Sequence, residues 1–359
     1  MLTRGYSKNL FQRDISTPAA SKGSVLILAV WALLFLTVIA FACGALVRQE
    51  IFLVKKVETK TRLYRAAYSG ALWAIDNVRS YYKDRDPHEG FTLNNLLASN
   101  PGLFKDKPIG DIKVSARYEY VSGYPGKKET RYGLTDEESL INVNTVDKRF
   151  LGPFFRRVSG LDPEIARALA TNVVDWRDVD DMAGDEVSSG SERAGYKSSG
   201  YKYSPKNAPF ESVEELLLVK GMDMKTFLAV RDRVTVFGYG LLNINTVTSD
   251  VLEAIGLDQP LVNKIIAYRA GPDGVEGTAD DNYFKTRNLI VESLSRTIGL
   301  DQTQKEKLTE VVFSNILDIK SSLFRTTCVS SDSGSSSTGR LVVVFDRSGI
   351  VKYSSYLEY

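Results

Sequence analysis

The chain has 359 residues, of which 43% are apolar and 25% charged, and these proportions exclude a disordered tail or a collagen-like repeat. Its first 23 residues hold four basic and one acidic side chain and residues 24–47 hold none, which leaves 42 basic and 43 acidic groups in residues 48–359. A body that is so nearly neutral argues against nucleic-acid binding. One histidine, His88, and two cysteines, Cys43 and Cys328, exclude a zinc site built from these residues and oppose a histidine-based catalytic triad.

The first predicted element is an uncharged stretch over residues 24–47. A helix of this length, at about 1.5 Å per residue, spans a bilayer core of roughly 30 Å. It exceeds the apolar region of about 7–15 residues in a secretory signal, so we expect it to stay attached as a single membrane pass. The preceding basic residues place the N-terminus in the cytoplasm and the body in the periplasm, at the inner membrane. A plain signal anchor is one alternative, and lipoprotein cleavage before Cys43 is another, although Ala40 and Phe41 fit that pattern poorly.

A sequence typical of a processing site stands directly before this stretch. Lys22-Gly23 against an apolar run looks like the site of a prepilin peptidase, which cuts after glycine on the cytoplasmic side. We expect Ser24 to become the N-terminus, with N-methylation, and Leu28 to become the fifth mature residue. Most pilin-like proteins carry glutamate there, and its carboxylate is thought to meet the amino terminus of a neighbouring subunit. An apolar residue avoids the roughly 2.5–3.5 kcal/mol cost of an acid inside a membrane helix.

Beyond Arg48 the sequence becomes amphipathic. Its apolar residues recur at spacings of three and four, which predicts one helix from about Ser24 to Tyr82. The repeating positions are Tyr64, Ala67, Tyr68, Ala71, Leu72, Ile75 and Val78. This long helix is typical of pilins, and a membrane anchor followed by an unrelated helix is the alternative.

Predicted strands stand at both ends of the body. Residues 111–121 alternate between apolar and polar, and a second strand is expected around 129–134 after a turn at 123–126. A further strand is predicted over 323–329, followed by a polar loop at 332–339 and a hairpin over 340–359 whose turn is Arg347-Ser348-Gly349. The region between the two groups of strands is mostly helical. We therefore predict an α+β fold in which the long helix packs on a small antiparallel sheet, with a large helical domain inserted.

The insert repeats itself. The sequence INVNT at 141–145 returns as LNINT at 242–246, each time followed by a helix. A turn of the form Gly-hydrophobic-Asp occurs at Gly160, Gly221, Gly256 and Gly299, which indicates short helices of the helix-hairpin-helix or sterile-alpha-motif-like class. The predicted segments are a leader over 1–23, a membrane half-helix over 24–47, a pilin helix with first strands over 48–139, the insert over 140–320 and closing strands over 321–359.

Helix-hairpin-helix modules often bind DNA through the backbone amides of a glycine turn. Each turn here offers an aspartate, which repels phosphate, so we expect no nucleic-acid partner. A membrane-anchored DNA-binding protein of DNA uptake stays as the alternative function, and a cell-surface interaction protein without pili is a third.

A strongly acidic segment begins at Asp175 and indicates a calcium site. Closely spaced carboxylates repel one another unless they are solvated or share a cation, and calcium takes six to eight oxygen ligands in flexible geometry. Trp176 within the cluster favours a structured site over a solvated loop. The predicted ligands are Asp175, Asp178, Asp180, Asp181, Glu192 and Asn207.

A second acidic loop over 271–282 is rich in glycine and oxygen ligands. Asp273, Asp280 and Asp281 are weaker metal candidates, because their spacing does not match an EF-hand. The prediction is therefore one or two structural calcium ions. No nucleophile with a partner, paired catalytic acids or phosphate loop is recognisable, so we expect no enzyme activity.

Taken together, these motifs resemble the minor pseudopilin K family of type II secretion systems, also called general secretion pathway protein K, over most of residues 21–320. The resemblance rests on Lys22-Gly23, Leu28, the two Asn-x-Asn-Thr repeats, Asp175-Trp176-Arg177-Asp178, 205–210 and 212–216. It implies a pilin-like core with an inserted helical domain, calcium in the acidic loop, and a place at the tip of a short periplasmic pseudopilus. Other minor pseudopilins, the inner-membrane secretion platform and the prepilin peptidase are the implied partners. The 271–282 loop is less typical of the family.

Overall fold

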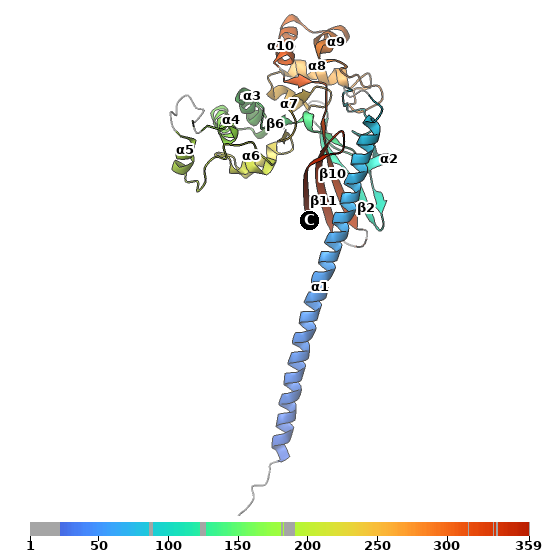
Figure 1. Ribbon diagram of the computed structural model, residues 1–359, viewed down its shortest axis with the longest axis vertical. Helices are drawn as coiled ribbons and strands as arrows, with labels where there is room; N and C mark the ends of the chain where they lie inside the picture. The colour runs from blue at the N-terminus through green and yellow to red at the C-terminus, as the bar shows by residue number, and fades with distance from the viewer. Residues whose placement is uncertain are drawn as a thin grey trace, which may run out of the picture. The chain divides into compact units, whose positions relative to one another are not determined.

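A computed structural model describes residues 22–85, 89–122, 127–180, 182, 191–314, 316–332, 334 and 337–358 (Figure 1). The chain divides into two compact units, Met1–Thr59 and Lys60–Tyr359. The long helix α1 (Lys22–Tyr82) supplies the described part of the first unit and the opening segment of the second.

Helix α1 agrees with the predicted helix over 24–82. It contains a stretch that is long and apolar enough to cross a membrane, and the side chains of this stretch are exposed to solvent rather than buried in protein. Leu28, at 70% exposure, is one of them. A helix that is apolar on all sides without protein to cover it has the character of a membrane segment.

In the second unit, α1 packs against a sheet through small residues. Ala67, Ala71 and Ala74 are fully or almost fully buried, and Gly70 lies between them on the same face. A Cβ atom at Gly70 would stand 2.6 Å from Cγ1 of Val114, so only glycine allows the helix this close to the strand. The core between helix and sheet also contains Phe324 and Cys328.

The sheet is antiparallel, with the strand order β1-β2-β10-β11-β12 and β5 paired with the start of β10. Its strands therefore come from both ends of the body, as the sequence indicated. Their bounds are β1 Lys107–Ile109, β2 Ile112–Ala116, β5 Thr135–Asp136, β10 Leu323–Asp332, β11 Thr338–Asp346 and β12 Val351–Glu358. A short helix, α2 (Pro101–Phe104), precedes β1.

The prediction of a single strand over 111–121 is wrong. Strand β2 pairs with β10, and the Arg117 amide still donates to the carbonyl of Thr327 at 3.0 Å. The chain then leaves the sheet, and β3 (Tyr118–Ser122) forms a separate hairpin with β4 (Lys127–Arg131), earlier than the predicted 129–134. Alternation of apolar and polar residues predicts extended backbone but not which strand will be its partner.

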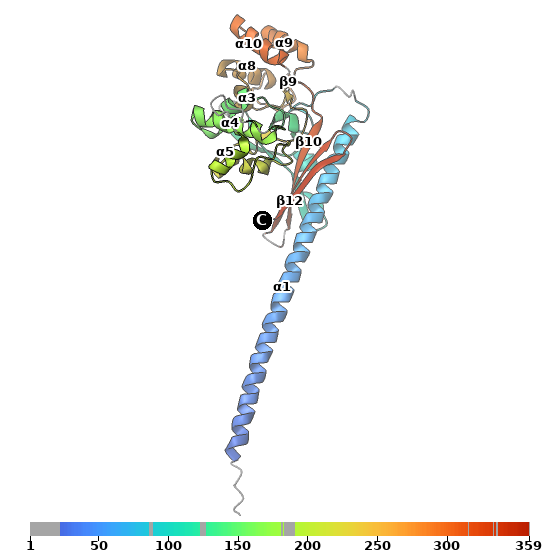
Figure 2. The same cartoon turned by 60° about the vertical axis from the view of Figure 1, so that its left-hand side comes forward.

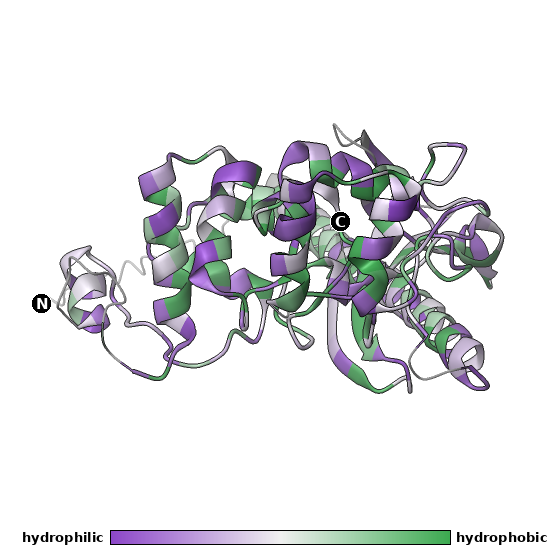
Figure 3. Cartoon of the chain, turned by 90° about the horizontal axis from the view of Figure 1, so that it is seen from above, coloured by the Kyte–Doolittle hydropathy of each residue, from purple (hydrophilic) through white to green (hydrophobic). Residues whose placement is uncertain are grey.

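Apart from the short turn η1, which lies just before it, the insert contains the remaining elements and has its own apolar core. Its helices carry polar and apolar residues on different faces (Figure 3), as expected where one face is buried. The helices are α3 Lys148–Ser159, α4 Pro163–Arg177, α5 Glu192–Ser198, α6 Met224–Val230, α7 Ser249–Ala254, α8 Gln259–Arg269, α9 Ile290–Thr297 and α10 Gln302–Phe313. The 3-10 turns are η1 Glu137–Ser139, η2 Val213–Leu218 and η3 Arg287–Leu289. There are also two parallel strand pairs. Strand β6 (Ile141–Asn142) pairs with β7 (Val234–Thr235), and β8 (Leu242–Asn243) pairs with β9 (Leu317–Asp318).

The four Gly-hydrophobic-Asp turns have one structural explanation. The glycine of each turn has a positive φ, for example 70° at Gly160 and 82° at Gly299, a backbone conformation that glycine adopts without strain. The aspartate then accepts a hydrogen bond from a backbone amide in the first turn of the next helix. These N-caps are Asp162, Asp223, Asp258 and Asp301.

Candidate functional site

The two halves of the insert share a framework of asparagine hydrogen bonds. In the first half, the amide of Asn144 donates to the side-chain oxygen of Asn142 at 2.9 Å. In the second half, the backbone amide of Asn245 donates to the side-chain oxygen of Asn243, also at 2.9 Å. Each INVNT-type sequence therefore forms a turn that its first asparagine holds closed.

The second asparagine of each turn binds a phenylalanine far along the chain. Asn144 donates to the carbonyl of Phe210 at 2.9 Å and accepts from its amide at 2.7 Å. Asn245 makes the same two bonds to Phe284, at 3.0 and 2.8 Å. Each of these asparagine–phenylalanine pairs fixes the C-terminal end of an acidic loop.

An arginine closes the other boundary. Arg177, the last residue of α4, donates to the carbonyls of Val143 and Val146. Arg269, the last residue of α8, donates to the carbonyl of Ile244 at 3.1 Å and to that of Val247 at 2.6 Å. The two acidic loops, between Arg177 and Phe210 and between Arg269 and Phe284, thus occupy equivalent places in a duplicated framework. Figures 1 and 2 show α8, α9 and α10 grouped together, apart from α4 and α5 of the first half.

Three of the predicted ligands of the first loop meet in space. Asp175, Asp178 and Glu192 each offer a carboxylate oxygen, and these atoms lie within 4.8 Å of one another. Asp175 and Glu192 are buried, and Asp178 is half-buried. Burial raises the pKa of Asp178, and the negative charge of Asp180 raises it further. Carboxylates in such positions are stabilised by a cation.

Some buried oxygen atoms at this loop lack a donor among the described residues. Oδ1 of Asp178 and Oδ1 of Asn207 are buried and have no hydrogen-bond partner among the described residues. Asn207 has a positive φ of 50°, and its Nδ2 donates to the main-chain carbonyl of Asp180, so its amide oxygen is held within the loop region. Carboxylate and amide oxygens of this kind are ligands that calcium prefers, and the residues present therefore fit that ion.

The other two predicted ligands are placed differently. Asp180 is exposed, and its Oδ1 accepts a hydrogen bond from the amide of Met182 at 2.9 Å. Asp181 lies outside the described residues. Both assignments therefore stay predictions.

The weaker candidates in the second loop also come together. Donor atoms of Asp273, Asp280 and Asp281 lie within 4.8 Å of one another. These carboxylates already accept hydrogen bonds inside the loop, because Asp281 binds the Gly277 amide at 2.7 Å and Asp280 binds the Thr278 hydroxyl at 2.7 Å. Hydrogen bonding to Thr278 lowers the pKa of Asp280, whereas burial raises that of Asp281.

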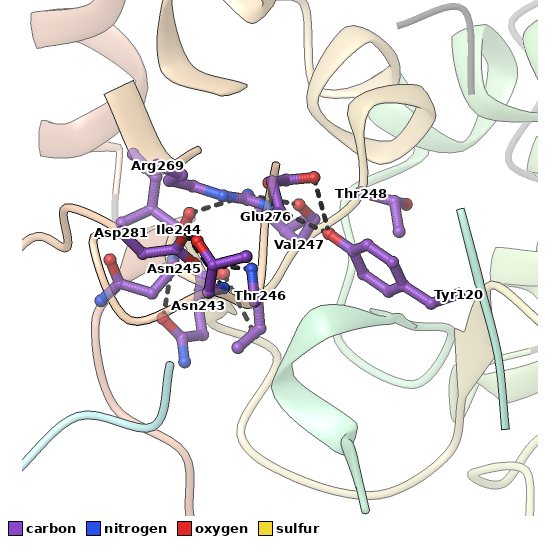
Figure 4. A network of polar contacts seen from close by, with 12 residues as sticks. Tyr120, Asn243, Ile244, Asn245, Thr246, Val247, Thr248, Arg269, Glu276 and Asp281 are labelled. Carbon is purple, nitrogen blue, oxygen red and sulfur yellow. Dashed lines mark hydrogen bonds and ion pairs between the residues drawn. The ribbon is translucent and has the colours of Figure 1, made fainter. Parts of the chain in front are cut away.

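A buried ion pair also lies in this second loop (Figure 4). Arg269 forms a salt bridge with Glu276, and both side chains are almost fully buried. The Tyr120 hydroxyl donates to Oε2 of Glu276 at 3.1 Å, and Arg131 donates to the Glu276 carbonyl at 2.7 Å. Burial opposes the charge of Arg269, but the carboxylate of Glu276 outweighs it, so the pKa of Arg269 is raised. A guanidinium from the chain itself thus supplies positive charge to this loop and links it to the β3–β4 hairpin.

Sequence reasoning missed this pair and the arginine clamp. The available signal was an arginine at the end of the helix that precedes each acidic loop, Arg177 in one half and Arg269 in the other. Reading the two halves against each other residue by residue would have found it.

Aromatic residues surround the first loop. Trp176 stacks on Phe210 with ring centroids 6.2 Å apart, and it contacts Tyr196 and Tyr203 at 6.2 and 6.3 Å. The hydroxyl of Tyr196 accepts from the amide of Lys220 at 2.9 Å. This cluster connects the loop to the turn before α6 and explains the burial of Trp176.

The predicted processing residues lie at the start of α1. Lys22, Gly23 and Ser24 are its first three residues. Cleavage after Gly23 stays a prediction.

A helix packed on an antiparallel sheet that receives strands from both ends of the body, with a duplicated helical insert, defines a pilin-like protein with an inserted domain. Residues 142–238 match the family model described as Type II secretion system (T2SS), protein K. This match confirms the resemblance to the minor pseudopilin K family and covers the first half of the insert.

The fold is also that of a solved structure. The chain is similar to one in the crystal structure of the GspK-GspI-GspJ complex from the enterotoxigenic Escherichia coli type 2 secretion system, with a TM-score of 0.60 and 15% sequence identity. The similarity covers 85% of this chain and 99% of that one. The search of curated proteins finds no match. The predicted α+β architecture with its long helix is thereby confirmed.

Proposed function

We propose that this protein is a minor pseudopilin at the tip of a type II secretion pseudopilus, where it starts or caps the filament that drives export of folded proteins. The observation that carries the proposal is an apolar stripe on the part of α1 that follows residue 59. Tyr68, Leu72 and Trp73 are 47, 48 and 50% exposed, although the opposite face of the same helix is buried against the sheet. Tyr68 and Leu72 are neighbours at i, i+4 and Trp73 widens the exposed apolar surface, and such a surface on a helix is suited to packing against other helices.

The proposed partners are other minor pseudopilins. The similar solved structure is a complex of GspK with GspI and GspJ. By analogy, long helices of two such subunits would cover Tyr68, Leu72 and Trp73 here. The role is one of assembly and not of catalysis.

The place at the tip follows from Leu28. After cleavage behind Gly23, the mature helix would have no carboxylate at its fifth position to meet the amino terminus of a subunit above it. Such a subunit can end a filament but cannot continue it. The membrane segment would anchor the protein in the inner membrane, with its N-terminus cytoplasmic and its body in the periplasm beside the secretion platform.

We further propose that the first acidic loop holds a structural calcium ion through Asp175, Asp178, Glu192 and Asn207. Bound there, calcium would supply the positive charge that compensates the carboxylates. Asn207 itself ties the loop to the segment behind α4, because its Nδ2 donates to the main-chain carbonyl of Asp180.

The test of the proposed function is copurification from membranes that contain the whole secretion system. Trp73→Glu should lose the copurifying pseudopilins that the wild type retains, because a charge in the stripe opposes apolar packing. Tyr239→Glu is the matched control, since Tyr239 is 83% exposed but lies in the insert, and it should retain them. Recovery of DNA instead of pseudopilins, with both variants behaving alike, would favour the DNA-uptake alternative.

The tip position needs a second measurement. Immunogold labelling of isolated pseudopili should place this protein at one end only. Label along the shaft would contradict the tip assignment, and Gly23→Ala should remove the label altogether because the leader is then retained.

A further inference from the structure

Three consecutive acids lie where the chain leaves the sheet and enters the insert. Asp136, Glu137 and Glu138 are 3, 1 and 6% exposed. Strand β5, which ends at Asp136, pairs with the start of β10, the strand by which the chain returns from the insert. The departing and returning segments therefore lie side by side at these acids.

Asp136 binds three uncharged donors from the returning segment and from the second half of the insert. Its Oδ2 accepts from the hydroxyls of Ser321 and Thr246, both at 2.5 Å, and from the Asn243 amide at 2.9 Å. Its Oδ1 accepts from the backbone amide of Glu138 at 3.0 Å. Asp136 thus joins the sheet to both sides of the domain boundary.

Glu137 is compensated by a cation. Arg325 of β10 donates to it from Nε at 2.5 Å and from Nη2 at 3.1 Å, and Thr235 at the end of the first half donates its hydroxyl. This ion pair compensates the negative charge of Glu137, one of the three consecutive acids.

Glu138 has no such partner among the described residues. It accepts hydrogen bonds from the Ser322 hydroxyl and, at 3.3 Å, from the Leu323 amide. The charged group that acts on it is Asp136, on its own segment, whereas Arg325 pairs with Glu137. Arg347, from the turn between β11 and β12, instead donates to the carbonyls of Ser321 and Glu89.

Burial raises the pKa of Glu138 to about 8, and the negative charge of Asp136 adds to this effect. Burial also raises the pKa of Asp136. At neutral pH this pair therefore holds a proton, which is what permits two carboxyl groups to stay buried side by side.

We propose that Asp136, Glu137 and Glu138 form a proton-dependent clasp that fixes the inserted domain to the sheet, and that loss of the proton from Glu138 loosens it. Ionisation places a second negative charge beside Asp136, at a place where the departing and returning segments are paired.

The direction of the pH effect follows from the two states of Glu138. In the unfolded chain its ordinary pKa is 4.5, whereas the folded chain holds the proton up to about pH 8. The contribution of Glu138 to stability is therefore most favourable at acid pH and is lost as pH rises through this window. The unfolding equilibrium constant should rise roughly tenfold per pH unit there.

The experiment follows unfolding of the full-length protein in detergent between pH 6 and 9. Glu138→Gln keeps the side-chain shape but cannot ionise, so its unfolding midpoint should fall less with pH and exceed that of the wild type at pH 9. Glu214→Gln removes an exposed acid and should keep the wild-type slope. Asp136→Asn removes the repelling charge and should move the loss of stability to lower pH.

Hydrogen exchange locates the effect. At pH 8.5 the amides of 134–143 and 317–325 should exchange faster in the wild type than in Glu138→Gln, while those of β11 and β12 should not differ. Identical pH slopes for the wild type and Glu138→Gln, or equal exchange at the junction, would overturn the clasp. If Glu138→Gln does not fold, an unshifted pH profile of Asp136→Asn would overturn it equally.

Discussion

The two halves of the insert share one framework but treat their acidic loops differently. In the second half Arg269 reaches into the loop and forms an ion pair with the buried Glu276. In the first half Arg177 makes the same kind of carbonyl contacts, yet Oδ1 of Asp178 and Oδ1 of Asn207 remain without a donor among the described residues. In the second loop a buried arginine therefore forms a direct ion pair with a buried glutamate, whereas in the first loop the side chain of Arg177 donates to main-chain carbonyls, and we propose that an added cation compensates the carboxylates there.

The largest expected effect comes from removing the internal cation. Arg269→Met leaves Glu276 buried without its counter-charge, which typically costs about 3–5 kcal/mol. The melting temperature should fall by roughly 6 °C or more, equally in calcium and in chelator. Lys307→Met is the control, because the Lys307–Glu310 pair is exposed and should contribute less than about 1 kcal/mol. A loss that calcium restores would show that the two loops do not differ as described.

Calcium removal should have the next largest effect. An ion that binds only the folded state stabilises it by about 2.7 kcal/mol at a hundredfold excess over its dissociation constant. Chelation should therefore lower the melting temperature of the wild type by several degrees. Asp178→Asn combined with Glu192→Gln should abolish this difference, while Asp280→Asn combined with Asp281→Asn should preserve it. If the second pair abolishes it instead, the ion belongs to the other loop.

The smallest effect concerns the helix caps, which both halves share. Asp162→Ala in the first half and Asp301→Ala in the second each remove an N-cap and should cost about 1 kcal/mol, independently of calcium. Asp162→Ser and Asp301→Ser should restore most of this loss, because serine also caps. Urea denaturation measures these differences, and unequal costs would show that one hairpin depends on its turn more than the other.

The elements that sequence predicted well are those with a local signal. The periodicity up to Val78 predicted α1, and the alternation around Arg347-Ser348-Gly349 predicted the final hairpin. The alternation over residues 111–121 correctly predicted extended backbone. It could not show that the strand before Arg117 pairs with β10 while the strand after it pairs with β4. Pairing depends on β10, which lies about 200 residues away.

The sequence predicted that a cluster of acids forms the candidate site, but it did not predict which of these acids converge in space. Clustered acids indicated a cation site, and three of them do converge. That Asp175 points into the group while Asp180 is exposed depends on where α4 ends and on the path of the loop behind it. Arg269 and Glu276 are only 7 positions apart. Tyr120, however, lies 149 positions from Arg269, and no local pattern reveals that contact.

Calcium titration of the purified full-length protein, with binding followed by calorimetry, tests the difference between the two loops most directly. We predict saturable binding that Asp178→Asn with Glu192→Gln eliminates and that Asp280→Asn with Asp281→Asn leaves intact. Terbium luminescence excited through tryptophan in a Trp73→Phe background should report the same site, because Trp176 lies beside it. Absence of binding in the wild type, or binding that survives loss of Asp178 and Glu192, would contradict the account.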